Sequence, residues 1–540
     1  MSHNNLVVGK HTLESLTVGM YADNRIIFRE YIQNATDAID QAIKLGILRE
    51  GEGEIDITID LPHREIRIRD NGTGIPTEEV LHSLGDIGHS NKDHVTNRGF
   101  RGIGRLGGLG YCTELKFITS YQGEPYKTIT LWDAQELRRL LQPNSDLYEN
   151  VIEVVDAVTI IEKQEELTDA HYFEVVLTEI TDGHENLLDT DDIRCYLSQV
   201  APVPFNYQQG IVLQKINKHL CELGVRPEEY KLLLHAPNKM TEQIYKPYCR
   251  QVHAGKMENE MIQDICFFES FREDGALFLV GWYGKTELSG MVHDDSVNGL
   301  RIRKRNILIG DNHSLDTFFG NNRTYQNFNR WYVGEVYVFD DQLIPNARRD
   351  DFEKNKCYFK FKQAVEKTTH ALAKIPHKQS AKRSSNKKRK EIPSKMQSIS
   401  KEILNSGVTE TRKGQLIVQV DSLRKQARMI RPAAYSIPAY VSVEQSQIDQ
   451  SKQHNEALVI EVEGEKQEIL AELDALEEAI VSTNNFAANR LPTTLPKTCR
   501  KQIRIIFDVI DRVAPEGLAQ ELREEIITAL QPKRKTERNA

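Results

Sequence analysis

The sequence predicts an α+β protein with a sheet-containing N-terminal domain, an α/β middle domain and a helical C-terminal region. A helical run at 24–45 precedes two strand candidates, 54–61 and 65–70, in which apolar and polar residues alternate. Further strand candidates recur up to residue 339, and three amphipathic helical stretches lie near the end of the chain. These three observations place strands and helices in separate parts of the chain, as α+β proteins do.

Composition excludes several classes of protein. The 540 residues suffice for two to four domains, and a net charge of -9 argues against a chain-wide attraction to nucleic acid or anionic membrane. The seven cysteines include no CxxC pair, which argues against a zinc site or a disulfide framework. The chain has no run of eighteen apolar residues and no apolar signal-peptide core near its start. We therefore expect a cytoplasmic protein that is not associated with a membrane.

The helical run at 24–45 carries three polar residues on one stripe. Glu30, Asn34 and Asp37 fall at i, i+4 and i+7. A carboxylate one turn before a carboxamide can hold a water molecule beside a metal ion. The same triplet also occurs on the solvated face of an ordinary amphipathic helix, and taken alone it favours that interpretation.

The second strand candidate ends in a glycine-containing turn, 70–76. A carboxylate such as Asp70 at a strand end can accept a hydrogen bond from an exocyclic amine, and Gly72 and Gly74 let the backbone approach a ring closely. Asp-Asn-Gly is equally common in plain turns. This stretch alone does not separate the two interpretations.

A short polar segment, 83–92, has the character of a lid, and the densest glycine cluster of the chain follows at 99–110. Consecutive backbone N–H groups without Cβ obstruction can surround phosphate oxygens. The cluster is not GxxxxGK[ST], and no strand with GxGxxG precedes it, which excludes a P-loop and disfavours a dinucleotide fold.

The order of these pieces is more specific than any one of them. ExxxNxxD on a helix, DxGxG at a strand end, a lid and a glycine loop resemble the GHKL ATPase superfamily, above all the ninety-kilodalton heat-shock chaperones and the microrchidia ATPases. The resemblance covers about residues 10–180. It implies a Bergerat-type α/β sandwich for residues 1–185, with ATP and Mg²⁺ as ligands.

The resemblance also implies roles for individual residues. Glu30 would be the general base for the attacking water, Asn34 would ligate Mg²⁺, Asp37 would order the adenine side through water, and Asp70 would bind the adenine amine. Seven further residues would shape the adenine wall (Gly72, Gly74) or meet phosphates and hinge the lid (Lys92, Gly102, Gly104, Gly107, Gly110). Phosphoryl transfer needs little beyond such positioning and charge neutralisation.

Two departures from the chaperone pattern stand out. The glycine loop is one residue longer than the usual GxxGxG. The segment 171–177 begins His171-Tyr172-Phe173, where the family tends to carry Gly-Thr near the adenine. Adenine contact on that side is therefore open.

The middle domain is expected at 186–375, and the resemblance implies a ribosomal S5-like fold. Strand candidates are 275–284, 300–310 and 331–339. Apolar and basic residues alternate in 300–310, which predicts a strand with one wet face. Its basic stripe, formed by Arg301, Arg303, Lys304 and Arg305, would suit nucleic acid, although exposed strand residues are commonly charged.

An acidic loop at 340–352 follows the last of these strands. It resembles the middle-domain segment of the same chaperones, and by that match Arg349 reaches the γ-phosphate, with Arg348 as the neighbouring candidate. A planar guanidinium suits a transferring phosphoryl group. The plain alternative is an arginine that caps or salt-bridges a surface helix.

The last part of the chain begins with a basic, serine-containing run. We expect a solvated linker at 376–395, in which 382–390 could instead bind nucleic acid, and a helical domain at 396–540 interrupted at Gly407 and Gly414. Apolar stripes at 456–482, 500–513 and 518–530 either pack in a bundle or form a homodimer seam.

With these observations, the resemblance implies an ATP-hydrolysing conformational clamp, a homodimer that acts on a protein client. Two alternatives remain open. One is a nucleic-acid-associated clamp, and the other is a scaffold that binds nucleotide without turnover.

Overall fold

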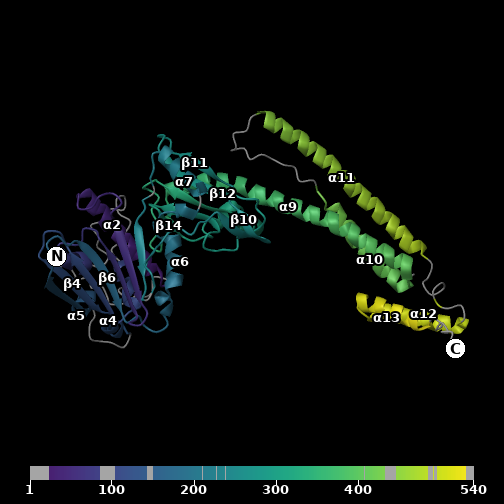
Figure 1. Ribbon diagram of the computed structural model, residues 1–540, viewed down its shortest axis with the longest axis horizontal. Helices are drawn as coiled ribbons and strands as arrows, with labels where there is room; N and C mark the ends of the chain where they lie inside the picture. Colours follow the sequence, from purple (N-terminus) through teal and green to yellow (C-terminus); the bar gives the residue numbers. More distant parts are fainter. Residues whose placement is uncertain are drawn as a thin grey trace, which may run out of the picture. The chain divides into compact units, whose positions relative to one another are not determined.

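A computed structural model describes residues 23–85, 104–142, 150–209, 211–226, 228–237, 239–406, 408–431, 445–483, 491 and 495–530. The chain divides into two compact units, Met1–Ala373 and Lys374–Ala540, which are described one after the other. The first unit contains two large sheets, and the second is helical (Figure 1). The predicted α+β class and the helical C-terminal region are confirmed.

The first sheet has eight strands in the order β5-β4-β3-β6-β2-β1-β7-β8. Their bounds are β1 Glu54–Asp60, β2 Glu65–Asp70, β3 Glu114–Ser120, β4 Tyr126–Asp133, β5 Thr159–Glu165, β6 Tyr172–Thr178, β7 Lys231–His235 and β8 Glu242–Gln243. Every neighbouring pair is antiparallel except β1 and β7. In β1 every second residue is buried, because one face of the sheet meets the core.

Helix α2 (Ile26–Lys44) packs against β1 and β2 on the covered face (Figure 1). The shorter elements of this part are α3 Val80–Gly85, η1 Gly104–Gly110, α4 Ala134–Leu140, α5 Val151–Val158, η2 Glu185–Leu188 and α6 Thr190–Val200. Ile27, Phe28 and Ile39 of α2 are fully buried and share one apolar core with the sheet. These apolar side chains therefore hold α2 against the sheet.

The boundary expected at residue 185 does not separate two sheets. Strand β7 lies 46 positions beyond it and pairs in parallel with β1, from Glu54↔Lys231 to Thr58↔His235. Leu308, from farther along the chain, is also a member of the N-terminal apolar core. The two predicted domains thus share a sheet edge and part of a core.

The second sheet has five strands in the order β11-β12-β15-β13-β14. They are β11 Asp264–Phe271, β12 Leu277–Lys285, β13 Gly299–Lys304, β14 Ile307–Ile309 and β15 Val333–Val338, with a small pair β9 Gln251–Ala254 and β10 Met257–Met261 beside them. Helical elements here are η3 Tyr207–Gln209, α7 Ile211–Glu222, η4 Asp316–Phe319, α8 Arg323–Gln326 and η5 Asn327–Trp331. The predicted strands at 275–284 and 331–339 correspond to β12 and β15.

The wet face expected for 300–310 is wrong. Arg301 and Arg303 are 1% and 0% exposed, and both are bonded within the protein. The side chain of Lys304 is also mostly covered and donates to the carbonyl of Asp340. The strand is present, but Arg301 and Arg303 lie on a covered face, so these two arginines offer no surface to nucleic acid.

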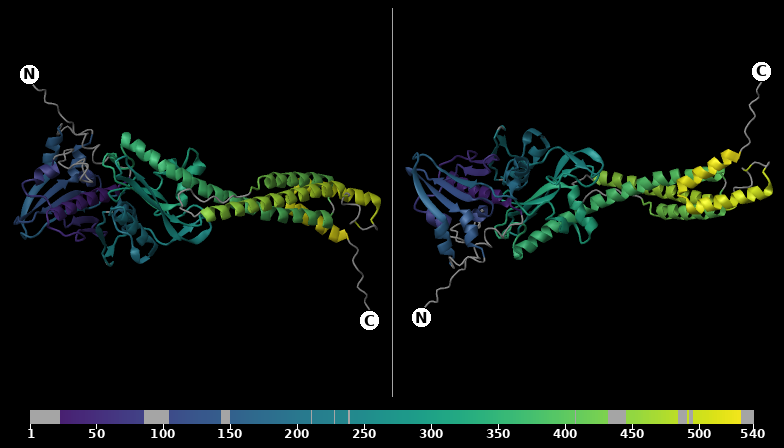
Figure 2. Two further views of the ribbon diagram at one scale, coloured as in Figure 1. Left: turned by 90° about the horizontal axis from the view of Figure 1, so that it is seen from above. Right: turned by 90° about the horizontal axis from the view of Figure 1, so that it is seen from below.

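The second unit is built from long helices. They are α9 Lys356–Ser406, which begins in the first unit, α10 Glu410–Arg428, α11 Gln445–Ser482, α12 Lys497–Val513 and α13 Glu516–Leu530. Helices α10 and α11 pack alongside each other (Figure 2). Apolar residues of α9, α10 and α11 form one cluster that contains the predicted stripe Ile469, Leu473, Leu476 and Ile480.

Two local expectations for this unit are corrected. The segment 376–395, expected as a solvated linker, is part of helix α9, which continues through Pro376 and Pro393. Gly414 lies inside α10 and does not interrupt it, and Gly407 lies outside the described residues. None of the described helices is both long and apolar enough to cross a membrane.

Candidate active site

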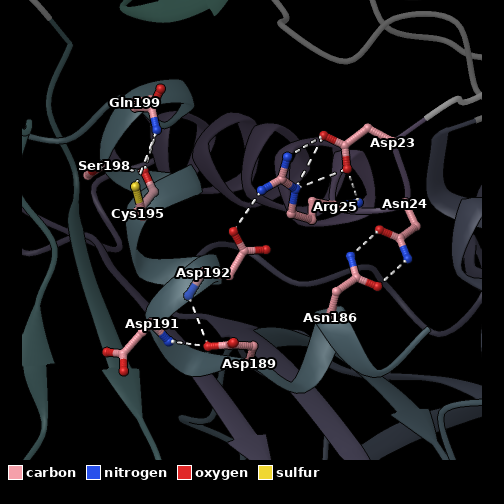
Figure 3. Close-up of polar contacts among 10 residues, drawn as sticks. All are labelled: Asp23, Asn24, Arg25, Asn186, Asp189, Asp191, Asp192, Cys195, Ser198 and Gln199. Atoms are coloured by element: carbon pink, nitrogen blue, oxygen red, sulfur yellow. Dashed lines mark hydrogen bonds and ion pairs between the residues drawn. The ribbon is translucent and has the colours of Figure 1, made fainter. Parts of the chain in front are cut away.

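The residues just before α2 are bonded to η2 and to the start of α6. The carboxamides of Asn24 and Asn186 face each other and exchange hydrogen bonds of 2.8 and 2.7 Å (Figure 3). Arg25 lies between two carboxylates, pairing with Asp23 at 2.9 Å and with Asp192 at 2.9 Å. These polar contacts fix the start of the helix that presents the predicted site residues.

The predicted polar stripe of α2 is largely covered. Glu30 is 8% exposed and Asp37 is 4% exposed, whereas Asn34 is half-buried. A carboxylate this deeply covered needs a partner. For Glu30 that partner comes from a distant part of the chain.

Arg349 donates from Nε to Oε1 of Glu30 at 3.1 Å. The two residues are 319 positions apart, and each side chain is about 10% exposed. The structure thus brings together the acid and the arginine that the sequence singled out separately. Neighbouring Arg348 is exposed and has no such contact among the described residues.

The backbone of Arg349 is strained and firmly held. Its φ is +56°, a left-handed conformation that costs a residue with a side chain about 1–3 kcal/mol. The carbonyl of Arg349 accepts from the Gly310 amide at 2.8 Å and from Arg29 Nη2 at 3.4 Å. Arg29 also donates to the carbonyl of Leu308 at 2.5 Å. The surroundings therefore impose the conformation that directs the guanidinium at Glu30.

The glycine segment lies directly against α2. A Cβ on Gly104 would fall 2.1 Å from Oε2 of Glu30, and a Cβ on Gly108 would fall 2.4 Å from the hydroxyl of Tyr31. That hydroxyl accepts from the Gly108 amide at 3.1 Å and donates to the carbonyl of Arg105 at 3.1 Å. The lack of a Cβ at these two positions lets the segment lie this close to the helix. The other two predicted glycines of the segment, Gly107 and Gly110, are buried in η1, whereas Lys92 and Gly102 lie outside the described residues.

Asp70 ends β2 with its carboxylate 4% exposed, and one of its oxygens accepts from the Gly72 amide at 2.8 Å. Gly74 has a φ of +67°, and a Cβ there would lie 2.0 Å from the carbonyl oxygen of Ser120. A Cβ on Gly72 would lie 2.6 Å from the backbone of Ala38 in α2. The 70–74 turn is therefore packed between α2 and β3.

The segment that departs from the chaperone pattern closes onto this same turn. A ring nitrogen of His171 lies 2.9 Å from the carbonyl oxygen of Gly72. Phe173 stands opposite Asp70 in the β2–β6 register and stacks on Phe117 at 5.8 Å. His171 and Phe173 therefore lie next to the Asp70 turn, at the positions where the sequence departs from the chaperone pattern.

Two contributors were missed by sequence reasoning. Gly108 stands in the middle of the predicted cluster, so a closer reading of that cluster could have found it. Arg29 gave no signal, because its acceptors Leu308 and Arg349 are 279 and 320 positions away.

Residues 25–164 match the family model described as histidine kinase-, DNA gyrase B- and HSP90-like ATPase. Similar curated proteins include chaperone protein HtpG of Coxiella burnetii, 38% identical over 87 residues, which are 15% of this chain and 14% of that protein. Endoplasmin homolog of Leishmania donovani is 29% identical over 106 residues, 18% of this chain and 14% of that protein. HtpG of Streptomyces coelicolor is 26% identical over 139 residues, 22% of each.

The matches therefore span less than a quarter of the length of these relatives. They confirm the resemblance drawn from the motifs: residues 25–164 are similar to ATPases of the histidine kinase, DNA gyrase B and HSP90 type, and part of the chain is similar to the HtpG chaperones.

Proposed function

We propose that this protein is an ATP-hydrolysing conformational clamp in which Glu30 is the general base and Arg349 contacts the γ-phosphate. The observation that carries the proposal is the buried Glu30–Arg349 pair. It joins the matched ATPase domain to a residue far outside it. Because Arg349 comes from a segment distant from α2, hydrolysis would depend on the position of the Arg349 loop relative to α2.

The residues present fit a magnesium nucleotide by their chemistry. A carboxamide oxygen such as that of Asn34 is a hard ligand of the kind that Mg²⁺ accepts, and the buried carboxylate of Asp70 is an acceptor for the adenine amine. Bound Mg²⁺ would neutralise phosphate charge. Asp37 would order water on the adenine side, Gly72 and Gly74 would form the wall, and the remaining predicted contributors are Lys92, Gly102, Gly104, Gly107 and Gly110.

The Glu30–Arg349 pair describes a resting arrangement. In this arrangement Nε of Arg349 occupies Oε1 of Glu30 at 3.1 Å. During turnover Arg349 moves from Glu30 to the γ-phosphate, which opens that oxygen to the attacking water. The same move stabilises the negative charge of the transferring group and ties turnover to a shift of the Arg349 loop.

We propose a protein client and a homodimer that closes on it in the cytoplasm. Helix α12 exposes four apolar side chains on one face, Ile505, Ile506, Val509 and Val513, which are 58%, 49%, 47% and 76% exposed. Such a face is suited to a second copy of the chain.

A nucleic-acid-associated clamp is the second candidate, and one observation favours it. From 374 to 390, α9 contains eight lysines and arginines and no acidic residue. Arg389 is paired with Glu465 and Glu461, whereas Lys382, Lys387 and Lys390 are exposed. Binding of duplex DNA that weakens with salt and is lost when these three lysines become glutamine would favour this candidate over the protein clamp.

The proposal is tested by phosphate release from ATP in the full chain. Glu30→Ala and Arg349→Ala should each lower kcat about a hundredfold or more while nucleotide still binds, because both act on the transition state. Asp70→Asn should weaken ATP binding itself, because the asparagine amide faces the adenine amine donor to donor. Retained turnover in Glu30→Ala contradicts the assignment of the base. A wild type that binds ATP without turnover shows a nucleotide-binding scaffold instead.

A further inference from the structure

The turn between β13 and β14 leads into a strand that contacts both α2, which carries Glu30, and the loop that carries Arg349. It is a two-residue turn in which Arg305 and Asn306 both have positive φ, +49° and +60°. Such turns match the twist of a hairpin and are normally made by Asn or Gly, so Asn306 fits and Arg305 is strained. Something outside the turn must hold it.

The strand that follows the turn reaches both α2 and the Arg349 loop. Leu308 of β14 is 3% exposed within the N-terminal apolar core, and its carbonyl accepts from Arg29. Two residues later the Gly310 amide donates to the carbonyl of Arg349 at 2.8 Å. The position of β14 therefore sets the position of Arg349 relative to Glu30.

The tip of the turn is also bonded to the first sheet region. Arg305 pairs with Glu228 at 3.0 Å and lies 3.8 Å from Asp40 near the end of α2. Asp40 in turn accepts from the Tyr230 hydroxyl at 2.5 Å. Both sides of the strained residue are thus held by charge.

Asn306 is the residue that ties the turn to the sheet beneath it. Its Oδ1 accepts from Lys246 Nζ at 2.9 Å, its Nδ2 donates to the carbonyl of Glu228 at 2.8 Å, and its own carbonyl accepts from Arg303 at 3.0 Å. Asn306 is 2% exposed. Its side-chain oxygen, its side-chain nitrogen and its backbone carbonyl are therefore all bonded.

A fully buried charge network supports Asn306. Lys246 and Arg303 both bond to Glu335 of β15, at 2.7 and 2.5 Å, and Glu335 has no exposed side-chain area. Burial alone would raise the pKa of Glu335, but the two cations outweigh burial and hold it at about 2. Ion pairs this deep are expensive and are weak evidence of a purely stabilising role, whereas they can fix one geometry.

We propose that Asn306 is a positioning residue for Arg349: anchored by Lys246 and Arg303, it fixes the left-handed β13–β14 turn and, through β14 and Gly310, the place from which Arg349 reaches Glu30. The proposal rests on the proposed role of Arg349. If Asn306 only stabilised the five-stranded sheet, its loss would affect the amides of the whole sheet and not the Gly310 amide in particular.

The test replaces Asn306 by glycine, which keeps the positive φ and removes both amide contacts. Hydrogen exchange in the full-length chain reports on geometry without reference to activity. We expect Asn306→Gly to speed exchange of the Gly310 amide about tenfold or more, with the β11–β12 amides unchanged, because the buried hydrogen bonds that hold the turn are lost. Equal acceleration across the whole sheet, or no change at Gly310, overturns the proposal.

Kinetics provide the second readout. Asn306→Gly should lower kcat about tenfold and leave ATP affinity within about twofold, and Arg349→Ala should then cost little more in that background, because coupled residues are not additive. Full additivity overturns the proposal. If Arg349→Ala alone leaves kcat unchanged, the proposed role of Arg349 fails, and hydrogen exchange at Gly310 still decides whether Asn306 sets the loop.

Two variants keep the test interpretable. Asn306→Asp retains the oxygen that Lys246 needs and tolerates positive φ, so it should restore slow exchange at Gly310 at least partly. Asn322→Gly removes a carboxamide from the exposed N-cap of α8, where glycine is well tolerated. It should leave both Gly310 exchange and kcat unchanged.

Discussion

Glu30 is confined by its neighbours as tightly as by its ion pair. One carboxylate oxygen accepts from Arg349, and the other lies where a Cβ on Gly104 would intrude to 2.1 Å. Gly104 does not have a positive φ, so its backbone would accept alanine and the conflict would fall on the Glu30 carboxylate alone. The end of the Glu30 side chain can rotate away from an added Cβ. Such a change should therefore affect catalysis by Glu30 more than the free energy of unfolding.

We predict that Gly104→Ala displaces the Glu30 carboxylate and lowers kcat about ten- to hundredfold, because a shift of about 1 Å is enough to misplace a catalytic group. Unfolding by urea should change little. Phosphate release and denaturant unfolding of the full chain measure the two effects. Gly414→Ala, on α10 with nothing within 4 Å of the added Cβ, is the matched control and should leave kcat unchanged. Wild-type kcat in Gly104→Ala would contradict the described contact.

Among the elements, β13 and β15 show how a charged strand becomes a core strand. They pair in parallel, with Arg301 opposite Glu335 and Arg303 two residues along. Because Glu335 lies between Arg303 and Lys246, the covered face carries opposite charges that compensate each other. Tyr248 and Tyr337 complete the network, donating to Glu335 at 3.2 and 2.5 Å.

Because of Glu335, the unfolding free energy of this part of the protein should fall as the pH is lowered. Its pKa is about 2 in the folded chain against 4.5 for the ordinary group. A depressed pKa contributes stability above pH 4.5 that is lost as the pH falls towards 2, on the order of 3 kcal/mol. Glu335→Gln leaves two buried cations unpaired and should be destabilised at pH 7. The difference in unfolding free energy between wild type and variant should narrow through this pH window.

Urea unfolding at pH 7, 5, 4 and 3, followed by the fluorescence of the fully buried Trp282 in β12, measures that difference. Glu269→Gln on β11 is the matched control. Glu269 is paired with His219 at the surface of the same sheet, and its removal should have a small effect at pH 7. A difference for Glu335→Gln that stays constant from pH 7 to 3 would show that its charge does not stabilise the fold.

At the scale of the whole molecule, the helical unit leaves an apolar face uncovered. On the inner side of α12, Phe507 and Asp511 are buried, and Asp511 bonds to Thr409 and Arg523. On the outer side, four apolar residues follow one another at i, i+1, i+4 and i+8. Contiguous apolar area of this kind is uncommon on the surface of a monomer, so the proposed dimer is assigned to this face.

We predict that the full chain sediments as a dimer, near twice its mass of 61.9 kDa, and that Ile505→Glu combined with Val509→Glu yields monomers. Burying two glutamates in the seam would leave unpaired charges there. Sedimentation velocity measures the change. Leu404→Glu alters an apolar residue on α9 that is more exposed, at 82%, and should leave the dimer intact. A dimer that survives the double substitution would place the seam elsewhere.

The extent of prediction differed from element to element for physical reasons. Strands β1 and β2 and helix α2 were predicted correctly, because alternation and helical spacing are local signals. The course of α9 through Pro376 and Pro393 was not, because packing of residues such as Ile392 and Met396 against α10 and α11 overrides a local helix-breaking preference.

The sequence alone determined which residues stand on α2, at the end of β2 and in the glycine cluster, since each depends on neighbours within a few positions. Only the tertiary structure decided that Arg349 meets Glu30, that β7 completes the first sheet, and that Arg301 and Arg303 are buried. Those outcomes depend on partners that lie tens to hundreds of positions away, such as Glu335 for Arg303. A local sequence pattern cannot show which distant residue supplies a compensating charge or which distant strand pairs with a sheet.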